Sequence, residues 1–155
     1  MKSVKAFFYI ASQILFAGAI LGAIYGVVVA ILGFALDDVL GDIVVSLSIL
    51  GLIVGGIYGT GAGLLLGIIV AFAVTLVQAN YEHPFSQGEA TLIGRVGDIT
   101  ALVVCIGTVI VTAGSGEEVF FIGIPAIIAF LACHWIILHY LRKHTDTSAE
   151  KAKSI

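Results

Sequence analysis

Residues 51–67 read GLIVGGIYGTGAGLLLG, and this stretch decides the fold of the chain. Glycine recurs in it at every fourth position, and positions 43–77 around it carry no charged residue. Residues four apart lie close together on one side of a helix, and glycines there let another helix backbone approach closely in lipid. The stretch therefore predicts a membrane helix that packs through its glycines, which are Gly51, Gly55, Gly59, Gly63 and Gly67.

The composition excludes a soluble domain. Of the 155 residues, 60% are hydrophobic and only 11% are charged, and the mean hydropathy is +1.17. Charged residues make up about a quarter of a typical soluble protein. The net charge of −3 and the scattered basic residues exclude nucleic acid as an expected partner. The lipid bilayer is the expected environment.

Four apolar segments predict an all-α bundle of four transmembrane helices within residues 1–141, followed by a polar, frayed cytoplasmic tail at 142–155. About 20 apolar residues suffice to cross the hydrocarbon, so the first two segments are long enough to tilt. A capping box at Ser86 and Glu89 predicts a short helical lead-in before the third span, and a second box at Ser115 and Glu118 predicts the start of the fourth. The four spans are expected at about residues 6–36, 43–78, 96–113 and 118–141.

The distribution of charge predicts the orientation. With four spans, every lysine and arginine lies on one side of the membrane. The charged residues of the two short loops on the other side are all acidic. A break of the second span at Gly59–Gly61 with a fifth crossing would place the basic tail outside, against the positive-inside rule. We therefore expect both termini in the cytoplasm. The absence of an organellar presequence favours the plasma membrane.

A second, shorter glycine row lies in the first span. Gly18, Gly22 and Gly26 have the same spacing, and residues 21–26 resemble residues 54–59 at an offset of 33. Spans one and two are joined by a short turn, so the two rows are expected to meet as a glycine-zipper hairpin. Two interpretations stay open. The rows hold only this hairpin, or span two also packs between protomers or against a larger complex, because Gly56 and Gly61 lie off the main row.

Polar residues within the spans belong to the cytoplasmic half. Gln13 follows Lys5 by eight residues, and His134 precedes Arg142 by eight, so both lie about 12 Å inside the helix ends. Ionisable residues inside a membrane suggest a functional site. The candidate polar cluster, as a vestibule for a small polar ligand or as a proton-linked site, is Gln13, Thr75, Gln78, Arg95, Asp98 and His134.

A purely structural interpretation of the same residues stays open. Arg95 and Asp98 have the i,i+3 spacing of an ion pair on one helix face. His134 is then expected to donate to a backbone carbonyl or to Gln13. Nothing polar at matching positions continues into the outer half, which argues against a simple ion channel.

No enzyme signature is present, so we expect no catalytic residue, no metal and no cofactor. A haem held between helices by two histidines needs both at the same depth, and His134 is alone there. Cys105 and Cys133 lie at matching depths in apolar runs and are expected as small core residues rather than a redox pair.

These observations predict a small non-enzymatic integral membrane protein that acts as an accessory or assembly subunit, or as a homo-oligomeric scaffold. The expected partner is a second copy or a larger membrane complex. The alternative is a small transporter or permeability module that uses the polar cluster. The residues do not indicate a substrate.

Overall fold

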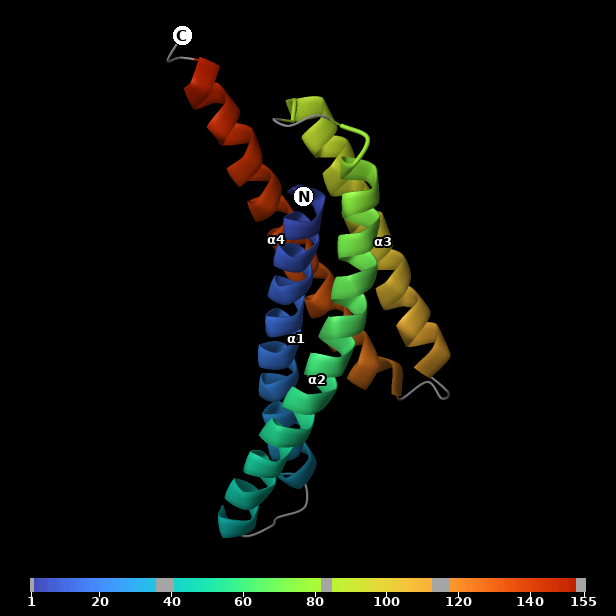
Figure 1. Ribbon diagram of the computed structural model, residues 1–155. Helices are drawn as coiled ribbons and strands as arrows, with labels where there is room; N and C mark the ends of the chain where they lie inside the picture. The colour runs from blue at the N-terminus through green and yellow to red at the C-terminus, as the bar shows by residue number, and fades with distance from the viewer. Residues whose placement is uncertain (1, 36–40, 82–84, 113–117, 153–155) are drawn as a thin grey trace.

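The computed structural model describes residues 2–35, 41–81, 85–112 and 118–152. They form four α-helices: α1 Lys2–Ala35, α2 Gly41–Gln78, α3 Gln87–Thr112 and α4 Glu118–Ala152 (Figure 1). All four are long and apolar enough to cross a membrane. The predicted all-α class with four membrane helices is confirmed, and the chain is a multi-pass membrane protein. The acidic turn at Asp37 and Asp38 and the capping box at Ser115 lie outside the described residues.

The structure refines the predicted extents of α2, α3 and α4. α2 runs without a break through Gly59–Gly61. α3 begins at Gln87 as one helix rather than as a lead-in and a span. Its predicted capping box is present, because the Ser86 N–H donates to Glu89 Oε2 at 2.7 Å and the Glu89 N–H donates to Ser86 Oγ at 3.3 Å.

The tail expected to fray at residue 142 is instead helical as far as Ala152. No glycine or proline interrupts residues 126–152, and the segment is rich in the good helix formers alanine, lysine and arginine. The intrinsic preference of these residues therefore lets α4 continue past its apolar span.

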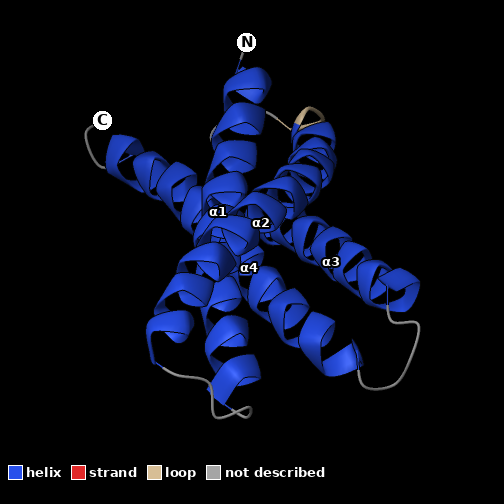
Figure 2. Ribbon diagram, turned by 90° about the horizontal axis from the view of Figure 1, so that it is seen from below, coloured by secondary structure: helices blue, strands red, loops and turns tan. Residues whose placement is uncertain are grey.

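The four helices pack in a ring. α1 contacts α2 and α4, and α3 contacts α2 and α4, with the most extensive contact between α1 and α2. Both chain termini lie at the same end of the bundle (Figure 1). We call the part nearest that end the terminal half; it contains the first halves of α1 and α3 and the second halves of α2 and α4. Toward the other end α3 and α4 diverge from the paired α1 and α2 (Figures 1 and 2).

Most of the core lies in the terminal half. Its largest fully buried side chains come from all four helices and include Ile10, Val70, Ile93 and Ile137. By contrast, no described side chain in residues 15–32 or 45–62 is buried. Large apolar side chains such as Ile57 and Leu65 are exposed along all four helices. Such an extensive exposed apolar surface suits lipid rather than water.

The glycines of α1 and α2 lie where these two helices meet backbone to backbone. A Cβ built on Gly22 would lie 2.6 Å from Gly59 Cα, and a Cβ on Gly59 would lie 2.7 Å from Gly22 Cα. Real Cβ atoms do not come this close, so only glycine fits at these positions. A Cβ on Gly61, in contrast, meets nothing within 4 Å. The same close approach to the opposite helix holds for Gly18, Gly26, Gly51, Gly55 and Gly67, while a Cβ on Gly63 would lie 3.0 Å from Ile14 O.

Candidate functional site

The six residues of the predicted polar cluster do not form one site. The structure brings Asp98 and His134 together and buries Gln78 in a different contact, and neither contact includes Gln13, Thr75 or Arg95. Two separate polar contacts therefore replace the single vestibule that the sequence suggested.

Gln78 is the deepest polar side chain in the described part of the core, with 1% of its surface exposed. It closes α2, and its Nε2 donates to the Tyr140 hydroxyl of α4 at 2.9 Å. The ring of Tyr140 lies 5.8 Å from that of Tyr9 on α1, centroid to centroid. A buried amide must be hydrogen-bonded to be tolerated, so this contact ties α2 to α4 beside α1.

Tyr140 is buried, and sequence reasoning missed it as the partner of Gln78. The available signal was that both polar residues lie in the terminal half, one on α2 and one on α4. Trp135 is exposed and stacks on His139.

Asp98 and His134 form the second contact, between α3 and α4. His134 Nδ1 lies 2.9 Å from Asp98 Oδ1, and the imidazole stacks on the ring of Phe130. With Asp98 ionised, Nδ1–H donates to the carboxylate, and Nε2 is left pointing to a further partner. The two helices meet here because Gly94 and Gly97 admit the side chains of Leu141 and Ile137.

The pair lies at the edge of the α3–α4 contact rather than in the core. The Asp98 side chain is 28% exposed and that of His134 is 42% exposed. A carboxylate and an imidazole are both groups that can bind a proton or a hydrogen-bonding ligand. This arrangement is chemically competent for proton exchange or for hydrogen bonding to a ligand.

Three structural alternatives for these residues do not hold. Arg95 is exposed and forms no ion pair with Asp98 within the described part of the chain. The partner of His134 is a side chain, so neither a backbone carbonyl nor Gln13 takes that place. Gln13 is exposed on α1. An i,i+3 spacing allows an ion pair but does not compel it, since a histidine on the next helix competes for the same carboxylate.

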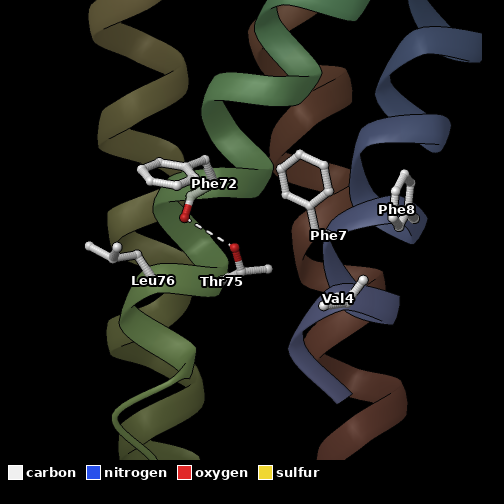
Figure 3. A pocket seen from close by; sticks show the side chains of 6 residues that line it. All are labelled: Val4, Phe7, Phe8, Phe72, Thr75 and Leu76. Carbon is white, nitrogen blue, oxygen red and sulfur yellow. Dashed lines mark hydrogen bonds between the residues drawn. The ribbon is translucent and has the colours of Figure 1, made fainter. Parts of the chain in front are cut away.

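Thr75 belongs to neither contact. Its hydroxyl donates to the backbone oxygens of Ala71, at 2.7 Å, and Phe72, at 3.1 Å. Thr75 also lines an open groove of about 430 Å³ between α1 and α2 (Figure 3). The other lining side chains are apolar: Val4, Phe7, Phe8, Phe72 and Leu76. The groove suits an apolar chain and offers no charged group for recognition.

The cysteines and the remaining acidic and histidine residues form no evident metal site. Within the described residues, no three His, Cys, Asp or Glu side chains are placed to hold an ion. Cys105 and Cys133 are buried in the core, and neither forms a disulfide.

Comparison with protein families, curated proteins and solved structures found no match to this chain. The function must therefore be argued from the geometry of its own residues.

The buried contact between α2 and α4 predicts a measurable coupling. Tyr140→Phe removes the acceptor of the Gln78 amide and should lower the free energy of unfolding by about 1–2 kcal/mol. Unfolding in detergent can be followed with a thiol-reactive dye, because both cysteines are buried. Tyr58→Phe, at an exposed tyrosine, is the matched control and should change nothing.

Gln78→Leu combined with Tyr140→Phe should recover most of the loss, because replacing both partners by apolar groups is nearly neutral. Equal stability of Tyr140→Phe and Tyr58→Phe would show that the hydrogen bond does not hold α2 to α4.

Proposed function

We propose that the protein is a small non-enzymatic membrane scaffold, either a homo-oligomer or an accessory subunit of a larger membrane complex, built on a glycine-zipper hairpin of α1 and α2. The observation that carries this proposal is the backbone contact of the two helices. In this contact the glycines of α1 face the glycines of α2, as Gly22 faces Gly59. Most of the sequence is devoted to helix packing in lipid, and its few polar side chains in the spans are too scattered to build an enzyme site.

The zipper is the source of stability that this role requires. In lipid no hydrophobic effect draws helices together, so close packing and interhelical hydrogen bonds must do it. Away from the terminal half, the described parts of α1 and α2 contain no buried side chain. There the glycine contact keeps the hairpin rigid, and a rigid hairpin presents a fixed apolar surface to a partner.

We further propose that the terminal half faces the cytoplasm of a plasma membrane. Lys5, Arg95 and Arg142 all belong to that half. The short connections at the opposite end contain only acidic charges in the sequence. An excess of basic residues in cytoplasmic segments sets the orientation of most multi-pass proteins.

Enlarging the zipper glycines should abolish association. Gly59→Leu with Gly63→Leu places side chains where the α1 backbone already lies, which forces the hairpin apart. The mass of the protein in mild detergent, measured by light scattering, should fall to that of one chain, and partners that are recovered with the unaltered protein should be lost.

Gly61→Leu is the matched control, because a side chain at this position meets open space. It should keep the mass and partners of the unaltered protein. The scaffold proposal fails if the double variant retains the same mass and the same partners as the control.

A transporter or permeability module is the second candidate, and the Asp98–His134 contact favours it. A carboxylate and an imidazole lie 2.9 Å apart between two membrane spans, and ionisable groups inside a membrane suggest a functional site. Proton-linked transport would use this pair to couple the movement of a small polar solute to a proton.

Asp98→Asn and His134→Ala should each abolish a pH-dependent flux into liposomes, because either change removes the proton-binding unit. Gln13→Ala, at an exposed polar residue away from the pair, should leave the flux unchanged. Absence of any flux with the unaltered protein, at every pH and with every solute tried, would eliminate this candidate.

A further inference from the structure

The Asp98–His134 pair has unused hydrogen-bonding capacity on a surface that faces out of the bundle. Only one oxygen and one nitrogen of the pair are engaged, at 2.9 Å. Within the described residues, no other hydrogen bond reaches Asp98 Oδ2 or His134 Nε2. The side chains of Asp98 and His134 are 28% and 42% exposed, so the pair is accessible from outside.

The exposed side chains one turn from the pair are apolar except for Arg95, which lies one turn before Asp98 on α3. Leu102 lies one turn beyond Asp98 on α3, and Leu131 and Leu138 lie one turn to either side of His134 on α4; all three are exposed. His134 is about 12 Å inside the apolar span, measured from Arg142. An isolated chain would present these polar atoms to lipid tails, where an unsatisfied polar group is costly. The surface therefore requires a polar partner.

We infer that this partner is a second copy of the chain, which binds through the same α3–α4 surface in a two-fold symmetric dimer. With both ring nitrogens of His134 protonated, the surface offers one N–H donor beside one carboxylate acceptor. A two-fold axis places the donor of each copy against the acceptor of the other, because residues in such an interface exchange contacts reciprocally. His134 Nε2–H would donate to Asp98 of the second copy, while Nδ1–H keeps its own Asp98.

The glycine rows are not available for this purpose. Gly22 and Gly59 already face each other within one chain, so a second copy has no access to them. The inference rests on the proposed scaffold function and specifies its partner and contact surface. It also assigns the glycines to folding and the polar pair to association.

Cysteine cross-linking in membranes tests the inference. In a background of Cys105→Ala and Cys133→Ala, Leu131→Cys should form a disulfide with its counterpart, since it lies one turn from the centre of the interface. Ile57→Cys, exposed on α2, is the matched control and should not cross-link. Adding Asp98→Asn or His134→Ala should raise the concentration at which half of the chain is dimeric by about tenfold.

The reciprocal change, Asp98→His with His134→Asp, keeps a donor and an acceptor on each copy and should restore cross-linking. Equal cross-linking with and without Asp98→Asn would overturn the inference, as would a single-chain mass in both mild detergent and lipid nanodiscs. The two proposals can fail separately. A monomer that still binds a different membrane protein overturns the dimer and leaves the accessory-subunit role intact.

Discussion

The close approach of the α1 and α2 backbones is the constraint on which the rest of the structure depends. A Cβ on Gly55 would lie 2.9 Å from Gly26 Cα, so a side chain there and a helix partner at this distance exclude each other. The contact fixes the register of the hairpin over most of its length. Because α4 packs on α1 and α3 packs on α2, the position of the second hairpin follows from that of the first.

The two halves of the bundle are stabilised differently. In the terminal half, four helices share a core with a buried hydrogen bond from Gln78 to Tyr140. In the other half, α1 and α2 pack through glycine while α3 and α4 diverge from them (Figures 1 and 2). The two contacts between polar side chains of different helices, Gln78 with Tyr140 and Asp98 with His134, involve other residues than the glycine contact.

Much of the fold was predictable from the sequence, and much of the site was not. Helix number and type followed from apolar segment length, because lipid allows few other backbone structures. The partners of Asp98 and Gln78 did not follow, because they depend on how far two helices rotate toward each other. Arg95 lay nearer to Asp98 in sequence than His134 did, yet the adjacent helix supplied the partner. The burial of Tyr140 did not follow either, because its position in the sequence does not say which side of α4 it occupies.

The register of the α1–α2 hairpin is the central claim, and one engineered disulfide tests it directly. A Cβ on Gly56 would lie 3.7 Å from Ala23 Cβ, within the range of about 3.5–4.5 Å that a disulfide requires. With Cys105 and Cys133 replaced by alanine, Ala23→Cys with Gly56→Cys should oxidise within one chain in native membranes, while Ala23→Cys with Gly61→Cys should not. Free thiols in the first variant, or a disulfide only between chains, would contradict the account.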